Sequence, residues 1–167
     1  MEKTYGTDGR HDQVITCSNG RTILIYGYGE EDGTGYDYRH NFAHRPTKEE
    51  VLDVITTHIN KLTDHKILSG FVWNNLNVWL SQENQFNFKA AYDVAVQTNG
   101  STLPIKFKLG EDEDGLPVYH TFKSMNAFAD FFTGAIGFIQ QTLVEGWEEK
   151  DSAAKWVDTL ELGEINN

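Results

Sequence analysis

Two groups of residues have side chains of the types that bind metal ions, so their spacing decides whether they form a site. The run Glu111-Asp112-Glu113-Asp114-Gly115 is rich in the oxygen ligands that Ca²⁺ prefers. If Gly115 is set at the glycine of an EF-hand loop, Gly110 falls on the first ligand position and Thr121 on the bidentate one. Neither residue supplies a carboxylate, so a solvated hairpin turn is expected. The loop from Glu30 to Asp37 has similar oxygen ligands with less pattern.

The second group is a pair of histidines four residues apart, His40 and His44. On a helix this spacing places two imidazoles on one face for zinc, but Asn41 follows His40 where the zinc motif has glutamate. The segment also does not have a helical pattern. We expect surface or loop histidines, a core-edge role for His58, and no metal or other cofactor.

Nucleophilic and nucleotide chemistry have little support in the sequence. Cys17 lies at the end of a predicted strand with no catalytic signature nearby, which favours an inert thiol. Gly27-Tyr28-Gly29 lacks the third glycine and the helix of a dinucleotide fingerprint. We predict no catalytic residue and no enzymatic activity. The alternative is an enzyme whose site is assembled from carboxylates far apart in the chain.

Aromatic side chains provide the best candidate for a binding surface. Because alternation in a hairpin buries one face, most of these rings are expected to be core. Trp73 and Trp79 are the candidates for exposed rings that contact a sugar or another small ligand. The set comprises Phe71, Trp73, Trp79, Phe86, Phe88 and Tyr92.

Composition limits the remaining classes of function. The chain has 167 residues, 39% of them hydrophobic, which supports one folded domain with a sizeable core. With 14 Lys and Arg against 25 Asp and Glu, the net charge is −11, which repels nucleic acid and anionic lipid. Cys17 is the single cysteine, so the sequence predicts no intramolecular disulfide. Met1 to Arg10 lacks the apolar stretch of a signal peptide, and no segment is long enough to span a membrane, which predicts folding in the cytoplasm.

Residues 1–45 are expected to form an accessory β-hairpin segment. After a flexible leader of about ten residues, strands are predicted at Val14–Cys17 and Thr22–Tyr28, around an Asn-Gly turn. A glycine-rich acidic loop, Gly29–Gly35, then precedes a third strand over Tyr36–Phe42.

Residues 46–162 are expected to form an α+β domain that begins with a helix. Thr47 and Glu50 form a capping box at its start. A hairpin follows, with strands Phe71–Trp73 and Asn77–Leu80 around Asn74-Asn75-Leu76. The inward face of the first helix is predicted to comprise Val51, Ile55, His58, Ile59 and Leu62.

The next helix is predicted to begin after Ser81 as its N-cap and to run to about Gln97. Asn99-Gly100 ends it. Phe86 is expected to pack as one unit with the preceding hairpin. The inward face is predicted to comprise Phe86, Ala90 and Val94, with Ala91 and Ala95 beside them.

A second hairpin, Ile105–Leu109 with Val118–Phe122, precedes a long helix capped by Ser124 that is expected to continue toward Leu160, with or without a break at Gly146. Its apolar positions cover more than one helical face, which favours a central helix and leaves a subunit interface as the alternative. These positions are Phe128, Phe131, Phe132, Ile136, Phe138 and Ile139. The expected fold class is α+β, with short antiparallel hairpins alternating with helices and a long C-terminal helix packed on them.

Lys66 to Ala95 also resembles a known family. The most specific segments are Gly70-Phe71-Val72-Trp73, Val78-Trp79-Leu80-Ser81, Glu83-Asn84-Gln85 and Lys89-Ala90-Ala91-Tyr92. They are similar to small phage and prophage proteins of a domain-of-unknown-function family encoded beside tail-fibre genes. The resemblance covers about Thr47 to Leu160 and leaves the N-terminal segment outside.

The resemblance implies a bacteriophage or prophage structural or assembly protein, associated with the tail or tail fibre. It implies phage structural proteins or a second copy of the chain as partners, in the bacterial cytoplasm or the virion. It carries over no enzymatic residue. The alternative function is a carbohydrate- or small-ligand-binding module that uses the aromatic hairpin with Trp73 and Trp79.

Overall fold

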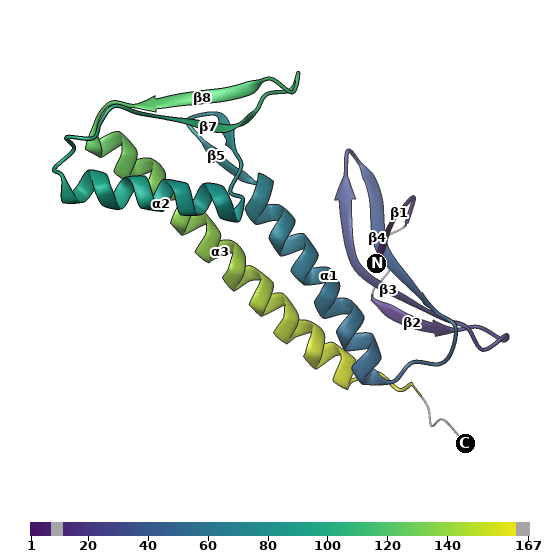
Figure 1. The fold of residues 1–167 in the computed structure, drawn as a ribbon. Coiled ribbons are helices and arrows are strands. Elements are labelled where there is room, and N and C mark those ends of the chain that lie inside the picture. The colour runs from purple at the N-terminus through teal and green to yellow at the C-terminus, as the bar shows by residue number, and fades with distance from the viewer. Residues whose placement is uncertain (8–11, 163–167) are drawn as a thin grey trace. The chain divides into compact units, whose positions relative to one another are not determined.

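The computed structural model describes residues 1–7 and 12–162 and confirms the predicted α+β class. Four strands are followed by helix, hairpin, helix, hairpin and a long helix (Figure 1). The chain divides into two units, which we call the sheet unit, residues 1–60 and 147–167, and the hairpin unit, residues 61–146. Two helices contribute a segment to each unit. The predicted domain boundary after residue 45 stays a prediction.

The sheet unit contains one antiparallel sheet in the order β1-β4-β3-β2. Its strands are β1 Glu2–Tyr5, β2 Gln13–Thr16, β3 Thr22–Glu31 and β4 Thr34–Phe42. The prediction of a flexible leader is wrong for Glu2–Tyr5, because this segment pairs with Tyr36–Arg39 of β4. Residues 8–10 of the predicted leader lie outside the described residues. The Asn19-Gly20 turn joins β2 and β3 as predicted.

The predicted loop Gly29–Gly35 is instead the end of a long hairpin. β3 and β4 extend to a turn at Asp32 and Gly33, whose φ angles of 50° and 74° suit a two-residue hairpin connection. Gly29 lies opposite Tyr36, whose ring fills the space that a Cβ would occupy. Aromatic cover of cross-strand glycines keeps such strands paired, so the glycines do not interrupt the sheet here.

Helix α1, Lys48–Ser69, begins at the predicted capping box. The backbone N–H of Glu50 donates to Thr47 Oγ1 at 3.2 Å, and the Thr47 N–H donates to Glu50 Oε2 at 2.8 Å. Leu62 is 39% exposed, so the prediction that it belongs to the inward face is wrong. The core of the sheet unit joins sheet, α1 and α3 through Leu24, Tyr26, Phe42, Val51, Ile55, Ile59, Ala153 and Val157.

The hairpin unit contains two hairpins that are linked by a backbone hydrogen bond. β5 Phe71–Trp73 pairs with β6 Leu76–Val78, and β7 Ile105–Glu111 pairs with β8 Pro117–Phe122. Asn74 and Asn75 make the first turn with φ angles of 47° and 60°, a region that asparagine tolerates. The Trp79 N–H donates to Leu109 O at 2.7 Å, which joins the end of the first hairpin to β7.

Helix α2, Gln82–Gln97, begins at the predicted cap, where Ser81 Oγ accepts from the Asn84 N–H at 3.2 Å. Its predicted inward face is wrong for Phe86, which is 72% exposed, and for Ala90 and Val94, which are exposed too, whereas Ala95 is buried and Ala91 packs beside the core as predicted. The helix has two apolar stripes, and the stripe with Phe88, Tyr92 and Ala95 is the one that packs. The reason lies in the partner surface, because this stripe places its rings against the rings of α3.

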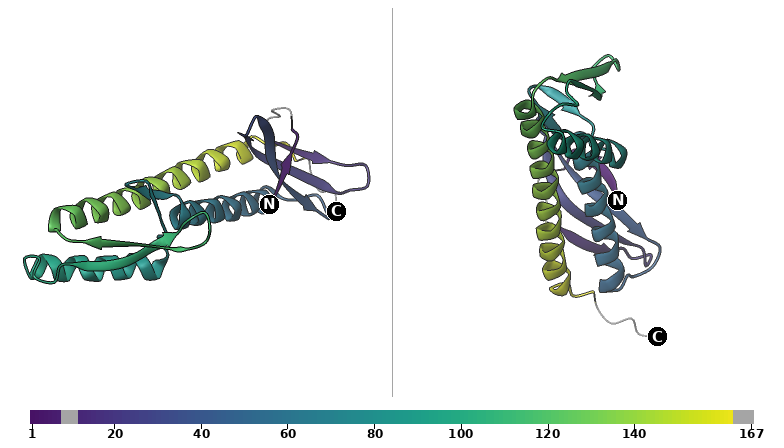
Figure 2. Two further views of the ribbon diagram at one scale, coloured as in Figure 1. Left: turned by 90° about the horizontal axis from the view of Figure 1, so that it is seen from above. Right: turned by 60° about the vertical axis from the view of Figure 1, so that its left-hand side comes forward.

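Helix α3, Met125–Asp158, is one continuous helix through Gly146, and Ser124 caps it by accepting from the Ala127 N–H at 3.3 Å. Phe128 and Phe131 are fully buried in the core of the hairpin unit. Ile136 is 44% exposed. Within this unit α2 lies against the first part of α3 (Figure 2), where the Tyr92 and Phe132 rings stack with centroids 4.5 Å apart.

Candidate ligand-binding site

The two candidate tryptophans have opposite environments. Trp73 is only 8% exposed, so its predicted role in a binding surface is wrong. Its indole packs between the rings of Phe122 and Phe131, and its Nε1 donates to Asp130 Oδ2 at 2.9 Å. Trp73 therefore belongs to the core, with its one polar atom satisfied at the edge of the core.

Trp79 is 46% exposed, as the binding-surface prediction requires. It follows β6 directly and lies two residues before Ser81, the N-cap of α2. Its N–H donates to Leu109 O at 2.7 Å, and its C=O accepts from Asn84 Nδ2 at 2.9 Å. Both backbone groups are thus fixed, and the indole projects from an anchored position.

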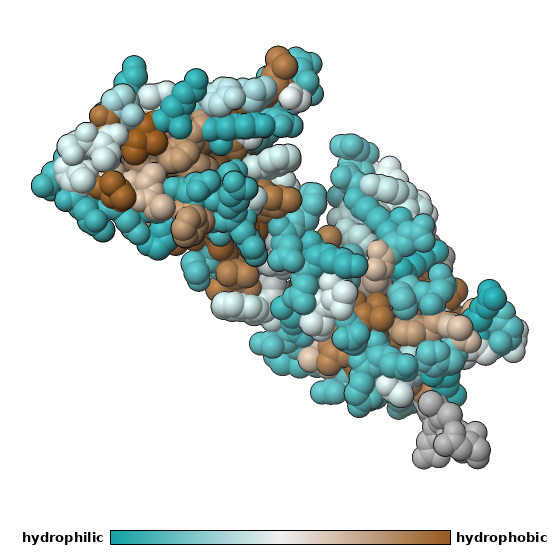
Figure 3. All heavy atoms as spheres, viewed as in Figure 1, coloured by the Kyte–Doolittle hydropathy of each residue, from teal (hydrophilic) through white to brown (hydrophobic). Residues whose placement is uncertain are grey.

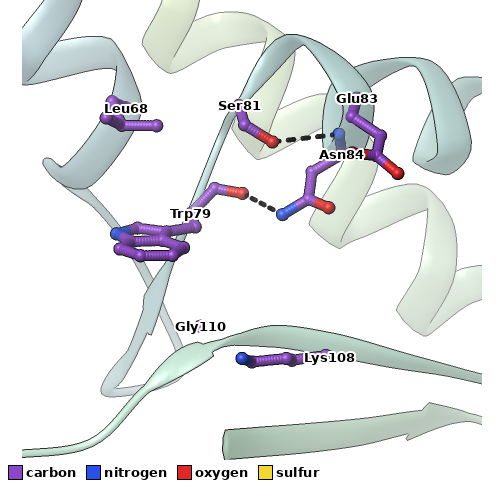
Figure 4. A pocket seen from close by; sticks show the side chains of 7 residues that line it. All are labelled: Leu68, Trp79, Ser81, Glu83, Asn84, Lys108 and Gly110. Atoms are coloured by element: carbon purple, nitrogen blue, oxygen red, sulfur yellow. Dashed lines mark hydrogen bonds between the residues drawn. The ribbon is translucent and has the colours of Figure 1, made fainter. Parts of the chain in front are cut away.

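The Trp79 groove is a cavity of about 380 Å³ beside this indole. Figure 4 shows the ring in the space bounded by the end of α1 and by β7, with the first turn of α2 at the side. The groove is lined by Leu68, Trp79, Ser81, Glu83, Asn84, Lys108 and Gly110. A volume of this size is in the range of small-molecule sites.

The floor of the groove depends on Gly110. A Cβ at this position would lie 2.9 Å from the carbonyl oxygen of Asn77, a backbone atom that has little freedom to move. Glycine therefore permits the close approach of β7 to β6. The register of β7 and β8 also shifts between Lys108 and Gly110, and such irregularities redirect neighbouring side chains.

The charges at the groove have opposite signs. Glu83 comes from the first turn of α2, and Lys108 comes from β7. Lys108 Nζ lies 2.8 Å from Glu111 Oε1, but both side chains are exposed and such surface pairs are weak. A ligand in the groove thus meets an indole, a carboxylate, an amide and an ammonium. Lys108 has to break only its weak ion pair with Glu111 before its ammonium can bind the ligand.

The sequence predicted only part of this site. Trp79 was identified from its type, and Ser81 from its capping position. Glu83, Lys108 and Gly110 were not identified as site residues. The signal for Lys108 was the alternation of β7, which sends Lys106 and Lys108 outward, but nothing local indicated that β7 would lie beside Trp79.

The positions weighed for metal binding have structural roles. Asp112 Oδ1 accepts from the N–H groups of Asp114 and Leu116 at 3.0 and 2.8 Å, which makes the acidic run a hairpin turn. His44 Nε2 lies 3.1 Å from Glu50 Oε1, and the His40 ring meets Phe42 edge to face. Within residues 1–7 and 12–162, no group of three or more His, Cys, Asp or Glu side chains is placed to hold a metal ion.

Burial lowers the pKa of His40 from its usual value, so its imidazole is held toward the neutral form. Cys17 is a free, partly buried thiol.

Among the helices that the structure describes, none is both long and apolar enough to cross a membrane. No protein-family model, curated protein or solved structure matches this chain.

Proposed function

We propose that this chain is a non-enzymatic bacteriophage or prophage protein, a structural or assembly component associated with the tail or tail fibre. It acts in the bacterial cytoplasm or in the virion, with phage structural proteins as partners. Support comes first from the sequence segments that resemble the phage family. In the structure these segments form one packed element: hairpin β5-β6 and the first three turns of α2.

The contacts of these segments explain why such residues occur together. Gln85 Nε2 donates to Leu80 O at 2.6 Å, and the Asn84 amide donates to Trp79 O at 2.9 Å, so the first turn of α2 holds the end of the hairpin. Gly70 precedes β5 where a Cβ would lie 2.6 Å from Lys66 O. The segments therefore specify a structural module, which supports a role in assembly.

The observation that carries the proposal is the exposed apolar stripe of α2, which we call the α2 stripe: Phe86, Ala90 and Val94. These residues recur at four-residue spacing on one helical face, and Phe86 is 72% exposed. A phenylalanine so exposed on an ordered helix is unfavourable in water and is typical of a surface that another protein covers. Hydrophobic side chains reach the surface over α2 and the hairpins (Figure 3).

The experiment is fractionation of cells that produce the phage, with quantitative mass spectrometry of purified virions and of assembly intermediates. We expect the wild-type chain in at least one of these fractions. Phe86→Ser combined with Val94→Ser should remove most of it, while Ile15→Ser, an exposed apolar site of the sheet unit at 39% exposure, should not. Absence of the wild-type chain from both virions and intermediates would contradict the proposal. Circular dichroism checks that each variant is folded.

A further inference from the structure

We propose that the Trp79 groove binds a neutral oligosaccharide, with one sugar ring against the exposed indole of Trp79. This inference is independent of the phage assignment and of the α2 stripe. It follows from four properties: an exposed indole on a fixed backbone, polar groups of both signs beside it, no excess positive charge and a second cavity next to the groove.

The aromatic surface is the first property. An indole offers a flat apolar face, and the C–H face of a pyranose is the matching surface among hydrophilic ligands. Trp79 is nearly half exposed, yet its backbone N–H and C=O are both hydrogen-bonded. Since the ring projects from a fixed backbone, less conformational entropy is lost when a ligand binds.

The polar groups are the second property. Glu83 offers carboxylate oxygens that accept from sugar hydroxyls, and Lys108 offers an ammonium that donates to them. The amide of Asn84 donates to Trp79 O, which leaves its carbonyl oxygen available as an acceptor. A small number of directional polar groups around an apolar surface fixes the orientation of a small polar ligand in a pocket.

The charge balance selects the class of saccharide. Glu83 and Lys108 line the groove, and the Lys108 ammonium already lies 2.8 Å from the Glu111 carboxylate, so the groove carries no excess positive charge. The whole chain carries −11, which repels acidic sugars and phosphates at long range. A neutral polyhydroxyl ligand therefore fits better than a uronic acid, a sialic acid or a phosphosugar.

A neighbouring groove indicates an oligosaccharide. This second cavity, of about 590 Å³, shares Leu68 and Ser81 with the Trp79 groove, so the two meet along the hairpin unit. Gln82 lies on its wall and adds a side-chain amide. A saccharide of more than one ring can extend from the Trp79 groove toward this cavity, where the Gln82 amide and the Asp64 carboxylate suit further sugar hydroxyls.

The test is an NMR titration of the full chain with maltotriose, cellotriose, N-acetylchitotriose and sialyllactose. The indole N–H signals of the four tryptophans are followed, and Trp79→Ala identifies the signal of Trp79. We expect at least one neutral trisaccharide to shift the Trp79 signal with saturation at millimolar concentration. Sialyllactose should bind more weakly.

Trp79→Ala should lower the affinity about tenfold or more. Since this variant lacks the Trp79 indole signal, its affinity is measured from the backbone N–H signals of Glu83 and Lys108, which line the groove. Lys108→Met should lower the affinity about three- to tenfold, because the ammonium donor is lost. Glu83→Gln should lower it about threefold, because one acceptor oxygen becomes an NH2 group and the charge of the other is lost. Trp147→Ala is the matched control, since Trp147 is 53% exposed and lies in the sheet unit. It should leave the affinity unchanged.

Three results would overturn the inference: no shift of the Trp79 signal with any neutral trisaccharide at 10 mM, the same affinity in all three groove variants as in the wild type, or tighter binding of sialyllactose. The two charge variants keep the test valid if Trp79→Ala fails to fold, because their side chains are exposed. Loss of the inference leaves the proposed function in place, since that rests on the α2 stripe.

Discussion

The two units of the molecule have cores of different chemistry. In the hairpin unit the core is a cluster of rings. The centroid of the Phe131 ring lies 5.3, 5.1 and 5.0 Å from those of Trp73, Phe88 and Phe122. In the sheet unit the buried residues are mainly aliphatic, and Ile55 and Ile59 of α1 share this core with Leu24 of β3. Rings reach far from the backbone, so they fill the space between two small hairpins and two helices that offer few side chains each.

The surfaces of the units differ as well. Exposed large hydrophobic side chains occur mostly in the hairpin unit, including Phe86, Trp79 and Val72. Charge is concentrated in the sheet unit: 8 Lys and Arg minus 16 Asp and Glu give −8, against 6 minus 9, or −3, in the hairpin unit. If the proposed function is right, we expect the hairpin unit, which has more exposed apolar side chains and less net charge, to make the contacts with partners.

The largest expected effect tests the ring core. Phe131→Ala should lower the free energy of unfolding by about 3 to 5 kcal/mol, because it removes a ring that four other rings surround. Urea denaturation followed by circular dichroism measures the change. Phe86→Ala, at an exposed position of the same unit, should change it by less than about 0.5 kcal/mol. Equal losses in the two variants would mean that the assigned core is wrong.

Substitutions at two glycines of α3 should have smaller effects on stability, and these effects should have opposite signs. Gly137→Ala should raise the free energy of unfolding by about 0.5 to 1 kcal/mol, because its Cβ would meet no atom within 4 Å and alanine favours the helix. Gly146→Ala should lower it, since the Cβ would lie 2.6 Å from Thr63 Oγ1. Thermal and urea unfolding of both variants give the signs. A gain in both would show that α1 and α3 are not so close at Thr63.

The smallest expected effect concerns the acidic sheet unit. Burial raises the pKa of Glu149, although its hydrogen bond from Tyr26 opposes the shift. A carboxyl whose pKa is higher in the folded state favours folding while protonated. That stabilising contribution is lost as the pH rises from 4.5, the usual pKa of the carboxyl, through the raised pKa of the folded protein.

Glu149→Gln should therefore stabilise the protein at pH 7, by less than about 1 kcal/mol because the group is partly exposed. The gain should vanish below pH 4.5, the usual carboxyl pKa. Unfolding by urea at several pH values measures it. Glu148→Gln, at an exposed neighbouring position, is the control. A pH-independent difference would argue against titration of Glu149 as the cause.

Local signals allowed much of the fold to be predicted, and long-range packing explains the errors. Thr47, Ser81 and the Asn74-Asn75 turn act through neighbouring backbone, so their sequence signals were sufficient. Strand β1 was missed because its pairing with β4 joins residues more than thirty positions apart, such as Thr4 and Asp37. Four residues of β1 have no pattern of their own that predicts a partner.

The site shows the same limit. Trp73 and Trp79 belong to the same short hairpin segment, and which one is buried depends on where the rings of α3 and β8 lie. The inward face of α2 was predicted wrongly for a similar reason, since Phe86 and Phe88 are equally apolar and only the partner surface decides between them. Lys108 joins Trp79 through tertiary packing of β7 on β6.

The central claim, that the hairpin unit makes the contacts with phage proteins, is tested most directly by site-specific photo-crosslinking. A benzophenone amino acid replaces Phe86 in one variant and Ile15 of the sheet unit in another, both exposed positions. Irradiation takes place in cells that produce the phage. We predict crosslinks from position 86 to a phage structural protein or a second copy of the chain, and few or none from position 15. Crosslinks from position 15 alone, or none from either, would contradict the account.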